Sequence, residues 1–221
     1  MSLSTIRDEN MKTYLFDFDG TLVDSMPIWG SVMKRILDED NIPYGEDLIK
    51  TITPLGALGT ARYFIGLGLG LTEEETLKKM TELLVKEYTE NVPAKEGVIE
   101  TLKKMKARGD SLNVLTASRH EALDPCLKRL GIFDIFDNVW SSDDFGTGKA
   151  DPKIYRLAAQ RLGKTVDEVI FVDDNLGADK TAKSAGMTVY GIYDESSKDY
   201  VEDMKKATDA YLYTFEEILN L

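Results

Sequence analysis

The chain has 221 residues, enough for one hydrophobic core or for a core with a small second domain. Its 39 acidic residues outnumber 27 lysines and arginines, and the net charge of -12 disfavours nucleic acid or an anionic membrane as a partner because either would be repelled. One cysteine, Cys126, excludes an internal disulfide, and the chain has neither an apolar run that could span a bilayer nor a signal-peptide core at its polar start. These features predict a cytoplasmic protein.

Two aspartates follow the first apolar run of the chain. Residues 14–16 are apolar and rich in aromatics, which predicts a buried strand, and Asp17 and Asp19 with Gly20 come at its carboxyl end. Alternation along a strand puts Asp17 and Asp19 on one side, while Phe18 turns into the packing. Two carboxylates that face one small space need a cation or a shared proton, so the sequence predicts a metal or a protonated carboxyl there.

A long helical stretch follows Ser25. Apolar residues recur at helical spacing up to a break at residues 41–43, and shorter helical pieces are predicted near 46–52 and 57–65. Thr72 and Glu75 have the spacing of a capping box, which predicts the start of a long helix through residue 88. Residues 25–92 are therefore predicted to form an all-helical insert.

From residue 93 onward the pattern alternates between helix and strand, which predicts a parallel sheet with helical crossovers. Strands are predicted at 112–115, 138–140, 169–172, 188–192 and 211–213. Helices are predicted near 96–107, 121–130, 152–163 and 198–206, with a further helix that ends at 186 and a last helix that begins at 214. The fold class is thus α/β, with a sheet core made of residues 1–24 and 93–221. Both junctions of the helical insert lie beside the end of the first strand, so it can act as a lid over the two aspartates.

The run DFDGTLVDS, from Asp17 to Ser25, resembles the first motif of the haloacid dehalogenase (HAD) superfamily. The similar branch is subfamily I with a helical C1 cap, which contains phosphoglycolate phosphatases and β-phosphoglucomutases. The resemblance implies a Rossmann-like core with an inserted helical cap. It also implies that Asp17 is a nucleophile that forms an aspartyl-phosphate, and that Asp19 protonates the leaving oxygen and then activates water.

Two later segments resemble the second and third motifs of this superfamily. Thr116, at a predicted strand end, would donate its hydroxyl to a phosphoryl oxygen, and Gly20 and Ala117 are further implied phosphate-binding residues. Lys149, in GKADPKIY, would supply a positive point charge that the acidic surface otherwise lacks. Ala150 stands where the family usually has a proline.

The strand end at Asp173 and Asp174 resembles the fourth motif, and the resemblance implies Mg²⁺ as the cofactor. Asp17 and Asp174 would bind it through their side chains and Asp19 through its backbone carbonyl, while Asp173 would lie behind these ligands or bind occasionally. Carboxylate and carbonyl oxygens suit this hard cation.

Other conspicuous residues are predicted to have structural rather than catalytic roles. Asp24 is expected to hold the turn into the insert or to cap its first helix, and His120, the single histidine, is expected to be solvated. The glycine-rich residues 66–70 are expected to end a helix, because no strand precedes them. Trp29 and Cys126 are expected to pack in the insert and in the core.

Two residues are left without a predicted role. Many relatives carry another Asp or Asn where this chain has Ala178, and Asp179 follows one position later. Residues 53–63 form the expected substrate-contact region of the insert, and Arg62, their only charge, is equally compatible with an ordinary helix surface.

The favoured function is that of a Mg²⁺-dependent phosphatase acting on a small phosphorylated metabolite. The protein is expected to be a monomer or a weak homodimer. The first alternative is a β-phosphoglucomutase-like mutase, but such mutases usually have valine and histidine where this chain has Thr21 and Trp29. A signalling receiver, which also combines an acidic pair with a phospho-accepting Asp, a Thr and a Lys, is the lower alternative. The order of these residues differs here, because the acidic pair comes last, and Asp19 has no use in a receiver. A cap that binds a protein partner also stays open, whereas a dehalogenase would lack Asp19.

Overall fold

The computed structural model describes residues 11–221, so most of the polar start lies outside the described residues. The chain divides into two compact units. The larger unit contains the residues up to Asp24 and Pro93–Leu221, and the smaller is Ser25–Val92. None of the helices in the described part of the chain is long and apolar enough to cross a membrane.

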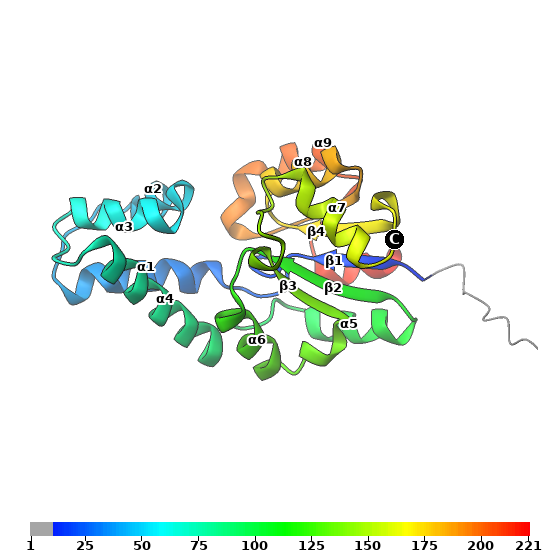
Figure 1. Cartoon of the computed structure of the whole chain (residues 1–221), viewed down its shortest axis with the longest axis horizontal. Coiled ribbons are helices and arrows are strands. Elements are labelled where there is room, and N and C mark those ends of the chain that lie inside the picture. Colours follow the sequence, from blue (N-terminus) through cyan, green and yellow to red (C-terminus); the bar gives the residue numbers. More distant parts are fainter. Residues whose placement is uncertain (1–10) are drawn as a thin grey trace, which may run out of the picture. The chain divides into compact units, whose positions relative to one another are not determined.

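Six parallel strands form the sheet of the larger unit within residues 11–221 (Figure 1). They are β1 (Thr13–Phe16), β2 (Ser111–Thr116), β3 (Asn138–Ser141), β4 (Val169–Asp173), β5 (Thr188–Ile192) and β6 (Ala210–Leu212). The order β3-β2-β1-β4-β5-β6 places β1 between β2 and β4. The strand order reverses there, and open parallel sheets bind ligands at the carboxyl ends of the strands beside such a switch point. The predicted α/β class is confirmed.

Helices cover both faces of this sheet. They are α5 (Val98–Ala107), α6 (His120–Arg129), α7 (Pro152–Arg161), α8 (Leu176–Ala185) and α9 (Val201–Ala207). Figure 1 shows α5 and α6 on one side of the strands and α7 and α8 on the other. Because both faces are covered, every residue of β1 and β4 is buried, which explains their continuous apolar sequences.

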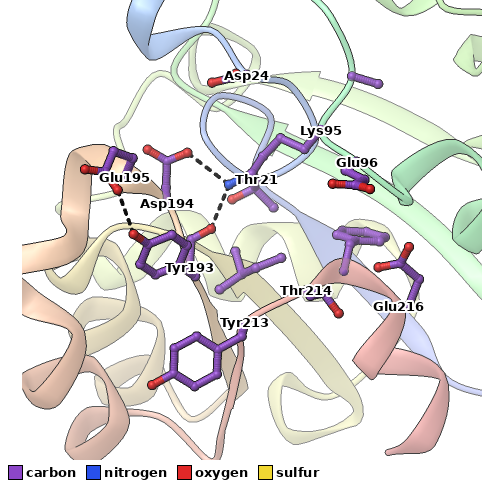
Figure 2. Close-up of a pocket in the computed structure, with 13 residues that line it drawn as sticks. Thr21, Asp24, Lys95, Glu96, Tyr193, Asp194, Glu195, Tyr213, Thr214 and Glu216 are labelled. Atoms are coloured by element: carbon purple, nitrogen blue, oxygen red, sulfur yellow. Dashed lines mark hydrogen bonds and ion pairs between the residues drawn. The ribbon is translucent and has the colours of Figure 1, made fainter.

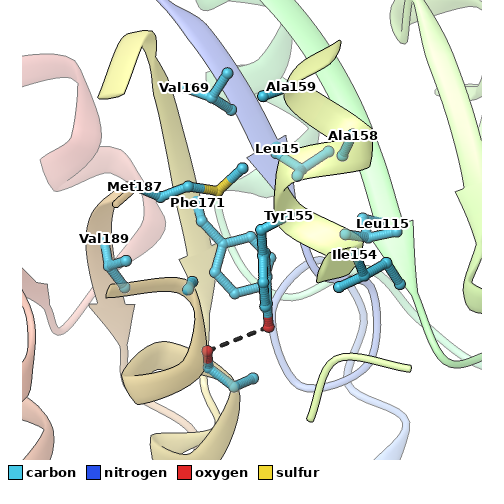
Figure 3. Packing of buried hydrophobic residues seen from close by; sticks show 12 residues of the cluster. Leu15, Leu115, Ile154, Tyr155, Ala158, Ala159, Val169, Phe171, Met187 and Val189 are labelled. Atoms are coloured by element: carbon cyan, nitrogen blue, oxygen red, sulfur yellow. Dashed lines mark hydrogen bonds between the residues drawn. The ribbon is translucent and has the colours of Figure 1, made fainter. Parts of the chain in front are cut away.

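The core between the sheet and α7 also anchors the loop that contains Lys149. Tyr155 of α7 packs edge-on against Phe171 of β4, with ring centroids 5.0 Å apart (Figure 3). Burial of such a side chain contributes about 2 kcal/mol. Its hydroxyl lies 3.0 Å from the carbonyl oxygen of Lys149 and 3.2 Å from that of Ala178. The packed ring therefore ties the loop before α7 to α8.

The smaller unit is all-helical and has its own core. It contains α1 (Met26–Glu39), α2 (Leu48–Ile52), α3 (Gly56–Gly66), α4 (Glu73–Glu90) and a 3₁₀ turn at Thr53–Leu55. The capping box is confirmed, because Thr72 and Glu75 exchange hydrogen bonds between side chain and backbone at the start of α4. Trp29 packs against the core of this unit and Gly66 ends α3, as the sequence predicts.

Of the two roles predicted for Asp24, the structure agrees with one. The Asp24 N–H donates to the carbonyl of Pro93 at 3.0 Å, which fits a residue that holds the turn into the insert, whereas the N-cap of α1 is Ser25, without a side-chain bond. The helix predicted near 198–206 begins as a 3₁₀ segment before α9, and the last helix is 3₁₀ rather than α. The remaining 3₁₀ segments are Phe133–Ile135, Ser142–Phe145, Val166–Glu168, Glu195–Tyr200 and Phe215–Asn220.

Candidate active site

The loop after β1 turns back tightly on itself. The N–H groups of Leu22 and Val23 both donate to the carbonyl of Phe18, and the Gly20 N–H donates to the carbonyl of Val23 at 2.9 Å. Gly20 has a φ of +74°, and a Cβ there would lie 2.4 Å from Oδ2 of Asp174. A glycine is therefore required at this turn, since it permits both the left-handed backbone and the close approach of the carboxylate.

Three buried carboxylates gather at the carboxyl ends of β1 and β4. Asp17 follows β1, Asp173 ends β4, and Asp174 comes next; one oxygen from each lies within 4.8 Å of the others. The Asp17 N–H donates to the carbonyl of Val172 at 2.9 Å, which continues the pairing of the two strands. The Thr21 hydroxyl donates to Oδ1 of Asp174 at 3.1 Å. Adjacent strands thus bring together residues more than 150 positions apart.

Lys149 joins this cluster from the loop before α7. Its Nζ lies 2.6 Å from Oδ1 of Asp17 and 2.8 Å from Oδ2 of Asp173, and its side chain is only 14% exposed. Burial by itself lowers the pKa of this lysine, but the charges of Asp17 and Asp173 outweigh burial and hold the pKa well above its usual value. Lys149 therefore remains a cation.

Negative charge exceeds positive charge in this buried site. Burial raises the pKa of Asp17 to about 7 in spite of Lys149, and the neighbouring carboxylates of Asp173 and Asp19 add to the rise. Burial and the charges of Asp173 and Asp17 also raise the pKa of Asp174 well above its usual value. A cluster of three carboxylates with one ammonium can accept a divalent cation, and its oxygen donors suit a hard cation such as Mg²⁺.

The carboxylate of Asp19 lies outside the acidic cluster found among residues 11–221 and meets the loop after β2 instead. The Ser118 hydroxyl donates to Oδ2 of Asp19 at 2.5 Å, and the Ser118 N–H donates to Oγ1 of Thr116 at 3.0 Å. Thr116 is buried at the end of β2, and the exposed Ala117 follows it. Ser118 is absent from the predicted site, although a second hydroxyl two positions after Thr116 was the available signal.

His120 is not simply solvated, so that prediction is wrong. Its Nδ1 lies 2.8 Å from Oδ1 of Asp124, and its Nε2 lies 2.9 Å from Oδ2 of Asp144. The hydrogen bonds to Asp124 and then to Asp144 raise the pKa of His120. The histidine therefore links the start of α6 to the segment after β3.

Three other conspicuous residues are not members of the acidic cluster. Cys126 is fully buried in α6, as predicted for a core residue, and burial raises the pKa of its thiol to about 11. Arg62 forms an exposed ion pair with Glu73 at 2.6 Å inside the helical unit. Asp179 is fully buried in α8, and neither of its carboxylate oxygens has a hydrogen-bond partner within residues 11–221.

Comparisons with known proteins agree with this architecture. A family model for haloacid dehalogenase-like hydrolases matches residues 11–186. A phosphorylated carbohydrates phosphatase from Thermotoga maritima is 29% identical over 214 residues, which cover 96% of this chain and 98% of that protein. A phosphoglycolate phosphatase from Rhodospirillum rubrum is 30% identical over 187 residues, which cover 80% of this chain and 78% of that protein.

Among solved structures, a candidate β-phosphoglucomutase from Thermotoga maritima is 28% identical with a TM-score of 0.79. The match covers 95% of this chain and 97% of that chain, so the similarity extends over the whole fold. The chain therefore belongs to the haloacid dehalogenase-like hydrolase family, where it groups with phosphoric monoester hydrolases.

Proposed function

We propose that this protein is a Mg²⁺-dependent phosphatase that hydrolyses a small phosphomonoester through an aspartyl-phosphate on Asp17. The observation that carries the proposal is the buried group of Asp17, Asp173 and Asp174 with Lys149, at the carboxyl ends of β1 and β4. The family assignment and the phosphatase relatives support it.

Asp17 acts as the nucleophile in the first step. One of its carboxylate oxygens forms a bond to phosphorus while the bond from phosphorus to the ester oxygen breaks, and Asp19 gives its proton to the leaving oxygen. The ion pair with Lys149 holds Asp17 in one orientation, and the Ser118 hydroxyl holds Asp19. The two carboxylates therefore have separate partners, which suits their separate roles.

In the second step Asp19 takes a proton from water, the water oxygen bonds to phosphorus, and the bond to Asp17 breaks. Inorganic phosphate leaves and both carboxylates return to their first states. The Thr116 hydroxyl and the backbone N–H of Ala117 are the proposed donors to phosphoryl oxygens, whereas the Gly20 N–H already donates to the carbonyl of Val23. These neutral donors and Lys149 would compensate for an otherwise acidic chain.

Mg²⁺ would be held by the side chains of Asp17 and Asp174 and the backbone carbonyl of Asp19, with Asp173 beside them. The bound ion would neutralise charge on the phosphoryl group. Three buried carboxylates against one ammonium fit such an ion, because a cation would relieve the repulsion between the carboxylates that adds to the raised pKa values of Asp17 and Asp174.

The helical unit is proposed to act as the cap that selects the substrate, since it is inserted directly after the catalytic loop. Its residues 53–63 are the proposed contact region. The charge of Arg62 is already engaged by Glu73 there, so a leaving group with an apolar or neutral surface is favoured. A cytoplasmic location, suggested by the single cysteine, and a monomeric or weakly dimeric state remain predictions.

A phosphosugar mutase is the second candidate, because a structural neighbour at 28% identity carries that candidate assignment. Thr21 and Trp29 stand where such mutases usually have valine and histidine. Moreover, the Thr21 hydroxyl is engaged by Asp174 at 3.1 Å. Hydrolysis is therefore the preferred proposal, and membership of a hydrolase family makes the receiver alternative less suitable.

Phosphate release from a panel of phosphomonoesters tests the proposal. The panel should contain phosphoglycolate, glucose 1-phosphate isomers and nucleotides, each with Mg²⁺ and with excess chelator. We expect release that requires the metal and falls at least about 1,000-fold in Asp17→Asn. Asp167→Asn, the same change at an exposed carboxylate, is the matched control. Undiminished release in chelator, or near-normal turnover of Asp17→Asn, would contradict the proposal.

A further inference from the structure

Lys95 lies just after the helical insert, beside a cavity of about 480 Å³ in the larger unit. Its Nζ lies 2.6 Å from the carbonyl oxygen of Gly20, 2.7 Å from that of Tyr193, and 2.9 Å from Oδ2 of Asp194 (Figure 2). The side chain is 19% exposed. An ammonium group has three N–H donors, so each of them has an acceptor here.

The backbone of Lys95 also meets the catalytic loop. Its N–H donates to the carbonyl of Leu22 at 3.0 Å, and its neighbour Ala94 pairs with Val23 in an antiparallel bridge. The residue therefore holds the loop through its backbone and through its side chain. A single residue thus connects the loop after β1, the segment that returns from the insert, and the end of β5.

The surroundings of Lys95 rule it out as an anion-binding lysine. It is the one basic residue among those that line the cavity, where five carboxylates also occur: Asp24, Glu96, Asp194, Glu195 and Glu216. A phosphate that approached this side would meet net negative charge and an ammonium with no free donor. The hydrogen bonds of Lys95 are therefore best explained by what they do to the loop.

Gly20 occupies the critical place in that loop. A Cβ on Gly20 would lie 2.4 Å from the Asp174 carboxylate, while the carbonyl of the same residue accepts a hydrogen bond from Lys95. Its N–H is engaged by Val23. Both peptide groups of Gly20 are thereby fixed directly after Asp19, whose backbone and side chain have proposed roles in the reaction.

We propose that Lys95 is a positioning residue, which fixes the Gly20 carbonyl and so orients Asp19 for both proton transfers. This inference rests on the proposed function. Misplacement of a reacting group by about 1 Å can cost about 100-fold in rate. Replacement of Lys95 by methionine keeps a similar length of side chain but removes all three donors, so the loop would lose its link to β5.

Hydrogen exchange of the loop amides tests the positioning itself without an activity assay. The amides of Gly20, Leu22 and Val23 are all hydrogen-bonded, so opening of the loop exposes each of them. We expect their exchange to be at least about tenfold faster in Lys95→Met than in the wild type. Unchanged exchange would overturn the inference, whether or not the protein proves to be a phosphatase.

Lys183→Met is the matched control. Lys183 forms an ion pair of similar length, 2.8 Å, with Asp209, whose carboxylate also binds the Val189 N–H near the other end of β5. This variant should lose stability without faster exchange in the catalytic loop. Lys95→Arg should restore part of the loop protection, because a guanidinium can still donate to the carbonyls and to Asp194.

Kinetics then show whether positioning matters for the reaction. In Lys95→Met we expect kcat to fall about 10- to 100-fold while KM changes less than about threefold, with kcat within about twofold of wild type in Lys183→Met. Equal loss of stability in the two variants with normal kcat in both would reduce Lys95 to a structural ion pair and overturn the inference. Absence of phosphate release from wild type would refute the proposed function, while the exchange measurement would still decide whether Lys95 fixes the loop.

Discussion

Asp179 makes the stability of this protein depend on pH in a way that one substitution can isolate. The side chain is fully buried in α8, and neither carboxylate oxygen has a hydrogen-bond partner in the described part of the chain. A Cβ on Gly191 of β5 would lie only 3.4 Å from Oδ2 of Asp179, so the carboxyl group lies against the sheet. Burial raises the pKa of Asp179 to about 10, with smaller contributions from Asp173 and Asp174. The carboxyl group is therefore expected to stay protonated in the folded protein at neutral pH.

The sign and size of the effect follow from proton linkage. In the unfolded chain Asp179 ionises near its ordinary value of 3.8, whereas the folded state retains the proton up to about pH 10. Its contribution to stability is thus largest below about pH 4 and falls as pH rises, by about 1.4 kcal/mol per pH unit. Between pH 5 and pH 8 the loss is at most about 4 kcal/mol. Asparagine has nearly the same shape and does not ionise, so Asp179→Asn removes this dependence.

Urea unfolding of both proteins at several pH values measures the difference. We expect Asp179→Asn to gain stability relative to wild type by about 2–4 kcal/mol between pH 5 and pH 8. The series should be run in chelator and repeated with Mg²⁺, because a bound cation would reduce the contributions of Asp173 and Asp174 but not that of burial. Asp167→Asn, at an exposed position, controls for the loss of one carboxylate. A difference that does not change with pH would refute the reasoning, since it would mean that the carboxyl ionises normally in the folded protein.

Three further substitutions test other parts of the structure. Gly20→Ala should lower stability by about 2 kcal/mol and weaken Mg²⁺ binding, measured by thermal melting and calorimetry, because the φ of +74° and the nearby Asp174 carboxylate leave no room for a Cβ; unaltered melting and binding would contradict this. His120→Gln should lower stability by about 0.5 kcal/mol at pH 5.5. This loss should vanish as pH rises through the raised pKa of His120, because the neutral imidazole no longer forms ion pairs with Asp124 and Asp144. Urea unfolding curves that show the same difference below and above that pKa would argue against it. Thr72→Ala should cost about 1 kcal/mol by removing half of the capping box with Glu75, and an unchanged melting temperature would show that the cap is not needed.

The local pattern of the sequence was sufficient to predict the fold class and most elements. The buried strands β1 and β4 are continuous apolar runs, and the capping box at Thr72 has a spacing that depends only on one helical turn. Such signals are local, because side-chain periodicity and caps arise within a few residues. The resemblance to the HAD superfamily rests on short motifs of the same local kind.

The tertiary structure alone decided which distant groups meet. The pairing of β1 with β4 brings Asp17 beside Asp173, but no local pattern specifies that order of strands. Likewise, the sequence contains no local sign that Ser118 would bind Asp19 or that Lys95 would reach the Gly20 carbonyl.

The prediction for His120 is wrong for a related reason. It considers only the neighbourhood of this residue, whereas one of its two partners, Asp144, lies 24 positions away in the sequence. Periodicity reports which face of an element is buried, but the partner of a polar group depends on how whole elements pack. For that reason the sequence predicts the candidate carboxylates, and the folded chain determines what holds each of them in place.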